Sequence, residues 1–244
     1  MTGSFRLGYV PGATPAKWAR IWAEREPDVP LDLIGVAAAE AADQVRGGDL
    51  DAVLLRLTTD RDGLHAIPLY TETTVVVIPK DHAIAAADEL STEELADETV
   101  LHPHDDTLDW TRPPGQPASQ RPDTTADAIE LVAAGVGLLV VPQSLARLHH
   151  RRDLTYRPLT DAPQSRVALS WLAEETSDLM EQFIGIVRGR TVNSTRGRPQ
   201  AEPQPKKPAA KKAEPKKAAS KGVAAKPVRR QGAPKPGRRG RRSR

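Results

Sequence analysis

The 244-residue sequence contains no cysteine. This absence excludes disulfide bonds, thiolate nucleophiles and cysteine-ligated zinc or iron–sulfur sites within the chain, and it is compatible with a reducing cytosol. No stretch approaches the roughly 18 apolar residues of a membrane-spanning helix, and the chain does not start with a basic segment followed by an apolar one. We therefore expect a soluble, cytoplasmic protein with no membrane partner.

Aromatic residues are scarce, at 4% of the chain, and charge is distributed unevenly. Residues 191–244 hold 18 basic and 2 acidic side chains and no aromatic residue, whereas the first 190 residues hold 17 basic and 30 acidic side chains. The overall net charge of +3 is thus a cancellation. A segment without aromatic residues buries too little apolar surface to offset its ordering entropy. We expect a folded body at 5–190 and a disordered basic tail at 191–244.

Hydrophobic periodicity predicts alternating strands and helices near the start of the chain. Strand-like runs at 5–10, 31–36 and 50–55 are separated by helical patterns at 15–26 and 37–46. Such alternation favours parallel strands joined by right-handed crossovers. Ligands of such sheets bind beyond the carboxyl ends of the strands.

The pattern changes after residue 65, which favours two α/β lobes over one continuous sheet. The later elements are expected as strands at 66–69 and 74–78, a short helix opened by the capping box Ser91–Glu94, a loop at 103–123, a helix at 126–134, a strand at 136–141, a helix at 143–149, strands at 154–157 and 167–171, and a final helix at 177–188.

Four segments, in this order and spacing, resemble the effector-binding domain of LysR-type transcriptional regulators. They are Gly8–Val10, Arg46–Ala52, Pro68–Tyr70 with Val75–His82, and Leu131–Pro142. The resemblance covers roughly residues 5 to 189 and implies a type II periplasmic-binding-protein fold, in which two α/β lobes are joined by crossover strands and enclose a small-molecule cleft.

On this resemblance we place lobe I at 5–72 and 174–190, and lobe II at 73–173. Family members usually pair as dimers, so the resemblance implies a homodimer. They also carry an N-terminal winged helix-turn-helix and a linker helix. Because Phe5 already lies in the first predicted strand, we expect this chain to lack both and not to bind an operator in the usual sequence-specific way.

The turn after the first strand supplies the first candidate ligand-binding residues, Gly12, Ala13 and Thr14. Free backbone N–H groups and the dipole at the following helix N-terminus favour an anion such as a ligand carboxylate. The alternative for Thr14 is that it only caps the helix. Family members often have Ser or Thr near the position of Gly12, so we expect either a less polar cleft than usual or one that binds nothing.

Three further candidates lie beyond other strands. Arg56 follows the third strand, where a guanidinium can bind a carboxylate bidentately; its alternative is an ion pair with Asp60 or Asp62. Thr124 and Thr125 precede a helix of the second lobe and are expected to face the cleft, with helix capping as the alternative.

The sequence contains few residue patterns that are typical of an active site. The run His102–Asp106 lacks a third ligand at helical spacing, so an incidental polar loop is favoured over a metal site. No Gly-x-Ser-x-Gly elbow, phosphate loop, His-Glu-x-x-His motif or three-glycine dinucleotide fingerprint is present. We expect no enzymatic activity, no cofactor and no metal.

The tail is expected to bind DNA. Its eight prolines prevent a continuous helix, and its cations can replace counterions on phosphates, which gives sequence-independent, salt-sensitive affinity. Residues 206–244 also resemble the tails of bacterial histone-like proteins, and membrane or ribosomal RNA binding is the alternative. The expected DNA-binding residues are Arg196, Gly197, Arg198 and Pro199, which resemble an AT-hook core suited to a narrow minor groove, and Lys206, Lys207, Lys211, Lys212, Lys216, Lys217, Arg229, Arg230, Arg238, Arg239, Arg241 and Arg242.

Together these features predict a DNA-associated regulator, in the cytoplasm or at the nucleoid. Its body binds a small carboxylate-type effector and its tail contacts DNA without sequence specificity. The alternative is a small-molecule or protein-partner binding module that the tail merely localises.

Overall fold

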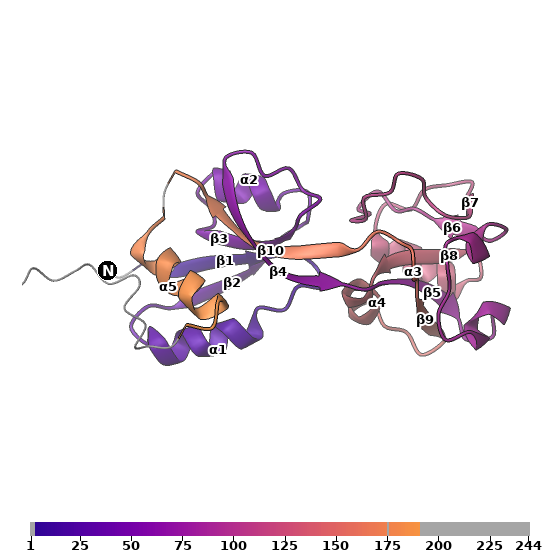
Figure 1. Cartoon of the computed structure of the whole chain (residues 1–244), viewed down its shortest axis with the longest axis horizontal. Helices are drawn as coiled ribbons and strands as arrows, with labels where there is room; N and C mark the ends of the chain where they lie inside the picture. Colours follow the sequence, from indigo (N-terminus) through magenta and orange to yellow (C-terminus); the bar gives the residue numbers. More distant parts are fainter. Residues whose placement is uncertain (1–2, 175, 191–244) are drawn as a thin grey trace, which may run out of the picture. The chain divides into compact units, whose positions relative to one another are not determined.

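The computed structural model describes residues 3–174 and 176–190, so the basic tail predicted at 191–244 lies outside the described residues. The described residues form two five-stranded sheets, with strand orders β2-β1-β3-β10-β4 and β7-β6-β8-β5-β9 (Figure 1). This arrangement confirms the two-lobed α/β class that the sequence predicts.

The first sheet combines parallel and antiparallel pairs. Strand β1 lies between β2 and β3 and is parallel to both, while β10 runs antiparallel to β3 and β4. The elements of this lobe are β1 (Phe5–Tyr9), α1 (Ala16–Arg25), β2 (Leu31–Gly35), α2 (Ala41–Arg46), β3 (Ala52–Arg56), β4 (Leu64–Glu72), β10 (Ser165–Leu172) and α5 (Asp178–Val187).

An aromatic cluster holds two helices against this sheet. The rings of Phe5, Trp22 and Phe183 lie with centroids 5.1 to 5.8 Å apart, joining β1, α1 and α5 on the side of the sheet that Figure 1 shows opposite α2. The Trp22 indole N–H donates to the carbonyl of Val29, at 2.8 Å, and so fixes the loop that leads into β2. Burial of this cluster sets the position of the β1–α1 turn.

The second sheet is buried on both faces. Along β5, Val75 and Val77 face one apolar cluster, and Val76 and Ile78 face the other, as alternation along a strand requires. The elements of this lobe are β5 (Thr74–Pro79), the 3₁₀ helices η1 (Ala83–Ala86) and η2 (Glu93–Leu95), β6 (Thr99–Leu101), β7 (Gln116–Pro117), α3 (Thr125–Ala133), β8 (Leu138–Pro142), α4 (Gln143–Leu148) and β9 (Leu154–Pro158).

The placement of β10 in lobe II was wrong. Ser165 to Leu172 pair with Glu72 to Leu64 of β4, and β10 also pairs with β3, so the strand belongs to the first sheet. Its alternate residues Val167, Leu169 and Trp171 lie in the core of the first lobe. An alternating strand can be buried in either lobe, so only its pairing decides where it belongs.

Several local predictions also differ from the structure. The helix expected from residue 37 begins at Ala41, and the helix expected after Ser91 is a single 3₁₀ turn. Elements η1 and β6 were not predicted, and the short strand β7 lies within the segment 103–123 that was expected to be loop. The gap between the strands expected at 66–69 and 74–78 reduces to Thr73, because β4 continues to Glu72 and β5 begins at Thr74. The two lobes are therefore joined by Thr73 and by residues 159–164.

Candidate ligand-binding cleft

A cavity of about 770 Å³ lies where the first lobe meets α4 of the second. Its first-lobe wall consists of Tyr9, the turn Pro11–Thr14 and the end of β2 with the two residues that follow, Gly35–Ala37. Its second-lobe wall consists of Ser144, Arg147 and Leu148. Most of these residues are apolar. That the cleft is less polar than usual stays a prediction.

Gly12 allows the two walls to approach closely. Its φ is +83°, a conformation that side chains disfavour, and a Cβ there would lie 2.5 Å from Ser144 Oγ and 3.1 Å from Arg56 Nη2. Any larger residue therefore requires the Ser144 or the Arg56 side chain to shift. Glycine at this position thus suits both the positive φ and the close approach of Ser144 from the second lobe.

Arg56 is buried next to the Gly12 turn and contacts both lobes. The residue is 2% exposed; its Nε donates to Glu72 Oε2 at 3.2 Å, Nη1 to the carbonyl of Pro11 at 2.9 Å, and Nη2 to Ser144 Oγ at 3.2 Å. Its guanidinium therefore holds the β1–α1 turn, the end of β4 and the start of α4 together. A ligand that binds Arg56 has to compete with these partners.

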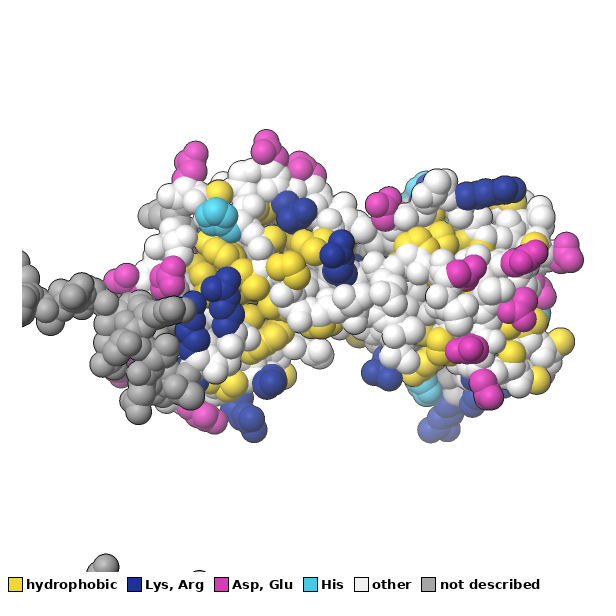
Figure 2. Space-filling view, viewed as in Figure 1, with side chains coloured by type: hydrophobic (Ala, Val, Ile, Leu, Met, Phe, Trp, Pro, Cys, Tyr) yellow, Lys and Arg dark blue, Asp and Glu magenta, His cyan; other side chains and the backbone are white. Residues whose placement is uncertain are grey.

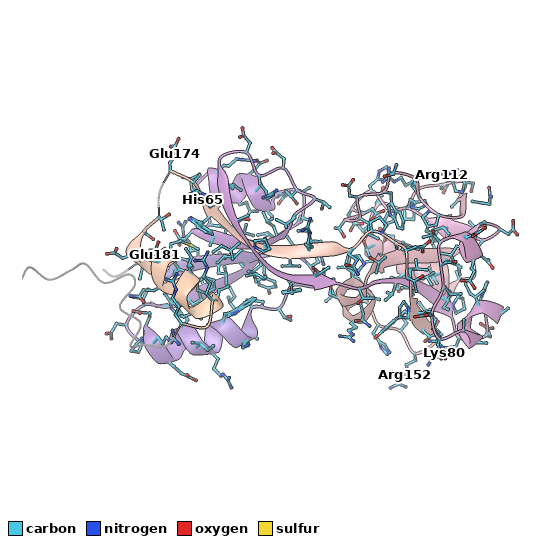
Figure 3. The ribbon with its side chains drawn as sticks, viewed as in Figure 1. His65, Lys80, Arg112, Arg152, Glu174 and Glu181 are labelled. Carbon is cyan, nitrogen blue, oxygen red and sulfur yellow. The ribbon has the colours of Figure 1, made fainter. Side chains whose placement is uncertain are left out.

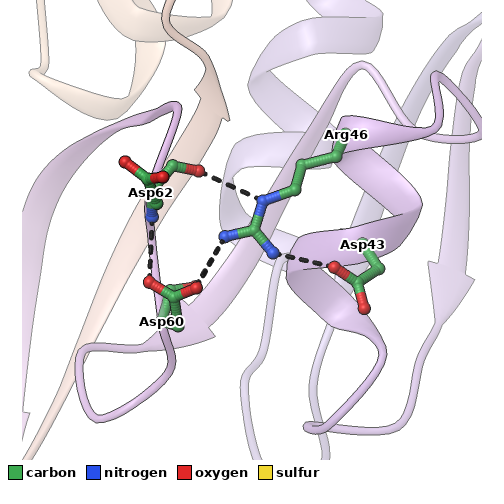
Figure 4. A network of polar contacts seen from close by, with 4 residues as sticks. All are labelled: Asp43, Arg46, Asp60 and Asp62. Carbon is green, nitrogen blue, oxygen red and sulfur yellow. Dashed lines mark hydrogen bonds and ion pairs between the residues drawn. The ribbon is translucent and has the colours of Figure 1, made fainter.

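The expected alternative partners of Arg56 are engaged elsewhere. Asp60 Oδ2 lies 3.2 Å from Arg46 Nη2, and the Asp62 carbonyl accepts from Arg46 Nε at 3.1 Å (Figure 4). Asp43 completes this network, with its Oδ1 2.7 Å from Arg46 Nη1. The prediction of an ion pair with Asp60 or Asp62 was therefore wrong, because the partner of Arg56 is Glu72.

A second cavity, of about 290 Å³, adjoins the first and is polar. It shares Gly12, Thr14, Ser144 and Arg147 with the larger cavity, and its other lining residues are Tyr70, Thr71, Glu72, Thr73 and Gln143. Burial of the Tyr70 phenol, followed by the nearby negative charge of Glu72, raises its pKa above the ordinary value. A phenol is protonated at neutral pH, so Tyr70 offers this cavity a hydrogen-bond donor.

Arg147 and Leu148 are exposed although they line the large cavity. Arg147 Nε donates to the Tyr156 hydroxyl at 3.3 Å, and no carboxylate within the described ranges forms an ion pair with Arg147. Leu148 is 54% exposed. The cavity mouth thus presents one cation that no acid offsets, next to a large apolar side chain.

Three of the four first-lobe candidates line this cleft, whereas Arg56 lines neither cavity. Gly12, Ala13 and Thr14 all border the large cavity, and Thr14 does not cap α1, whose N-cap is Pro15 without a side-chain hydrogen bond. The capping alternative for Thr14 was therefore wrong. Whether these residues and Arg56 bind a ligand stays a prediction.

Thr124 and Thr125 line neither cavity. Thr124 caps α3: its Oγ1 accepts from the Asp127 N–H at 3.1 Å, and Asp127 Oδ2 accepts from the Thr124 N–H at 3.2 Å. Thr125 is buried and donates to Asp105 Oδ1 at 2.9 Å. The capping alternative is confirmed for Thr124, and the helix that faces the first lobe is α4 instead.

The sequence reasoning missed the residues of α4. Ser144 and Arg147 are spaced i and i+3, so they share one face of the helix. A signal was available, because α4 starts directly after strand β8, just as α1 follows the turn after β1. Tyr70 was missed because nothing local indicates that β4 runs up to the cleft.

The His102–Asp106 run is held as a polar loop. Arg121 donates to the carbonyls of His102 and Pro103 at 2.7 and 2.9 Å. Burial lowers the pKa of His102 and raises the pKa of Asp106 relative to their ordinary values. Within residues 3–174 and 176–190, no group of three or more His, Asp or Glu side chains is arranged to hold a metal ion.

The expected DNA contacts, from the AT-hook-like Arg196–Pro199 to Arg242, lie outside the described residues. None of the helices in the described part of the chain is long and apolar enough to cross a membrane.

Two lobes, two crossovers and a cleft between them define a type II periplasmic-binding-protein-like domain. Residues 1–191 match the LysR substrate binding domain, and the chain belongs to this family. The effector-binding domain of BenM with its effector benzoate has the same fold, with a TM-score of 0.65 and 18% identity over 77% of this chain and 91% of that one.

Two curated relatives are named as activators. A "Probable hydrogen peroxide-inducible genes activator" from Streptomyces viridosporus is 28% identical over 184 residues, covering 69% of this chain and 59% of the relative. The Hca operon transcriptional activator of Escherichia coli is 24% identical over 204 residues, covering 78% and 68%. The chain thus spans only part of the length of these relatives, which are transcriptional regulators rather than enzymes.

Proposed function

We propose that this chain is the effector-sensing part of a transcriptional regulator. In this proposal the cleft binds a small organic acid and the basic tail holds the protein on DNA. The observation that supports it most is the cavity of about 770 Å³ at the junction of the lobes, because a ligand that contacts both walls links its binding to the relative position of the lobes.

The cleft offers several groups suited to a carboxylate. Arg147 supplies a positive charge, and Thr14 and Ser144 supply hydroxyl donors at the boundary between the two cavities. The α1 helix also begins beside Thr14, and the dipole at a helix N-terminus favours negative charge. These groups, together with Gly12, Ala13 and Arg56, form the proposed effector site.

The name of the Streptomyces relative refers to hydrogen peroxide, but a thiol–disulfide switch needs cysteine. This chain contains none. The residues present therefore support a response to a bound ligand over a response to thiol oxidation.

The charge distribution supports the proposed role of the tail. Residues 1–190 hold 17 basic and 30 acidic side chains, a net charge of −13, and Figure 2 shows Asp and Glu side chains spread over both lobes. Such a body repels phosphates, whereas the 18 basic side chains of residues 191–244 attract them. Body and tail also attract each other, so DNA and the body compete for the tail.

We further propose that the body pairs as a homodimer.

A salt series tests this proposal. Fluorescence anisotropy is measured with a labelled duplex at increasing NaCl concentrations, for the full chain and for a version that ends at Arg190. The proposal expects affinity of the full chain to fall steeply with salt, by about tenfold or more between 50 and 200 mM, and the shortened chain to lose binding. Equal affinity of both forms would refute the assigned role of the tail.

A further inference from the structure

We propose that the cleft selects a monocarboxylate with an extended apolar body over a dicarboxylate of the same length. This inference rests on the proposed function, that the cleft binds an organic acid, and it names the class of acid. It is carried by the apolar lining of the large cavity and by the charges that border the small one.

The large cavity has room and apolar walls for a hydrophobic body. Tyr9 lies across from Gly35, where a Cβ would sit 3.8 Å from the ring Cζ and hydroxyl oxygen, so the absent side chain leaves space. Val36 and Leu148 border the same space. Leu148 is 54% exposed, and an apolar ligand in the cavity would remove more of this side chain from water.

The charges of the cleft favour one carboxylate. The guanidinium of Arg56 is offset by Glu72, because the two side chains form an ion pair and are both buried. Arg147 is the charged residue left without an offsetting acid among the described residues that line the two cavities. The cleft therefore has an excess of one positive charge, which one carboxylate neutralises.

The position of Glu72 disfavours a second carboxylate. Glu72 borders the small polar cavity, which adjoins the large one through Gly12, Thr14, Ser144 and Arg147. A second ligand carboxylate in the polar cavity lies next to the Glu72 carboxylate, because Glu72 lines that cavity and its partner Arg56 does not. In the large cavity a second carboxylate loses hydration against apolar walls. Both placements weaken binding of a dicarboxylate.

Isothermal titration of the full-length protein at pH 7.5 and 150 mM NaCl tests the inference with three probes of equal length: octanoate, octanedioate and 1-octanol. We expect octanoate to bind about tenfold more tightly than either of the others. Arg147→Gln should weaken octanoate about fivefold and leave octanol unchanged. Leu148→Gln should weaken both, since it removes apolar contact.

The matched control is Arg152→Gln. Arg152 is exposed and its carbonyl accepts from Lys80, beside which Figure 3 shows it at the edge of the second lobe. This variant removes the same charge outside the cleft and should leave all three affinities unchanged. Circular dichroism melts confirm that each variant is folded, which the exposure of all three side chains favours. Octanoate or octanedioate that binds to the cationic tail instead of the cleft is recognised because the cleft variants do not change its affinity.

Two results would overturn the inference. The first is that octanedioate binds as tightly as octanoate and loses affinity in Arg147→Gln; this leaves the proposed organic-acid function in place. The second is that Arg147→Gln and Leu148→Gln leave octanoate binding unchanged. The role of the tail is judged separately, by the salt series.

Discussion

Arg56 and Glu72 form an ion pair in the interior of the protein, with Arg56 Nε 3.2 Å from Glu72 Oε2 and side chains 2% and 6% exposed. The pair joins the end of β3 to the end of β4, next to the single residue that leads into the second lobe. Two buried charges offset each other's desolvation only while both are present. The base of the cleft therefore depends on this pair.

Replacing Glu72 by Gln should destabilise the protein by about 3–5 kcal/mol, because the charge of Arg56 stays buried without its partner. Urea denaturation followed by circular dichroism measures the change. Glu181→Gln is the control: Glu181 lies on the exposed side of α5 (Figure 3), and its loss should change stability by no more than about 0.5 kcal/mol. Equal effects of the two substitutions would contradict the structural role of the pair.

Gly12→Ala should destabilise the protein more than Gly48→Ala does. Both glycines have a positive φ, +83° and +77°, but a Cβ at Gly12 meets Ser144 Oγ at 2.5 Å, whereas a Cβ at Gly48 meets nothing within 4 Å. We expect about 1 kcal/mol for Gly48→Ala from backbone strain alone. The added clash should bring Gly12→Ala to about 3 kcal/mol. Urea midpoints measure both, and equal losses would argue against close contact between the lobes here.

The loop at His102 should make stability depend on pH. Burial lowers the pKa of His102 in the folded state, so between that pKa and the ordinary value the unfolded chain binds more protons. The stability that the buried, neutral imidazole contributes is therefore fully present above the ordinary pKa. It is lost as pH falls through the lower pKa of the folded state. Urea denaturation between pH 7 and pH 5 should show a smaller loss of stability for His102→Asn than for the native sequence.

Asp106 should act in the opposite direction. Burial raises its pKa in the folded state, so its contribution is present below the ordinary pKa and is lost as pH rises through the folded pKa. Asp106→Asn should therefore gain stability relative to the native sequence as pH rises from 3 to 6. The same urea series measures it, and a gain that shrinks with rising pH would show that the carboxyl is better solvated than the fold implies.

The AT-hook-like segment gives a prediction for the tail. Arg196→Ala with Arg198→Ala should remove any preference for AT-rich over GC-rich duplexes, because these arginines are proposed to enter the narrow minor groove. Arg229→Ala with Arg230→Ala removes the same charge and should weaken both duplexes equally. Competition anisotropy measures the preference. Identical behaviour of the two double variants would mean that the tail binds DNA through its charge alone.

Local sequence patterns predicted which helices and strands form better than they predicted which strands pair. The order of β1, α1 and β2 follows from apolar periodicity within 31 residues, from Phe5 to Gly35. The place of β10 could not be predicted, since its pairing with β3 and β4 joins segments about a hundred residues apart. The sequence alone places apolar residues on a strand but does not choose between two apolar cores.

The cleft likewise combines residues that local sequence predicts with contacts that it does not. The turn at Gly12 and Thr14 was predicted because it follows a strand directly. The partners of Arg56 lie 16, 45 and 88 residues away, at Glu72, Pro11 and Ser144. No spacing rule links such positions, so the nearby Asp60 and Asp62 were the natural alternatives although they bind Arg46.

Methyl NMR of the full chain during an octanoate titration tests the central claim, that the cleft is the ligand site, most directly. The account predicts saturable shifts of the Val36 and Leu148 methyl groups, which line the cavity. It predicts no shift of Leu33 and Val136, which are 42% and 49% exposed but do not line it. Shifts at Leu33 or Val136 without shifts at Val36 and Leu148 would contradict it.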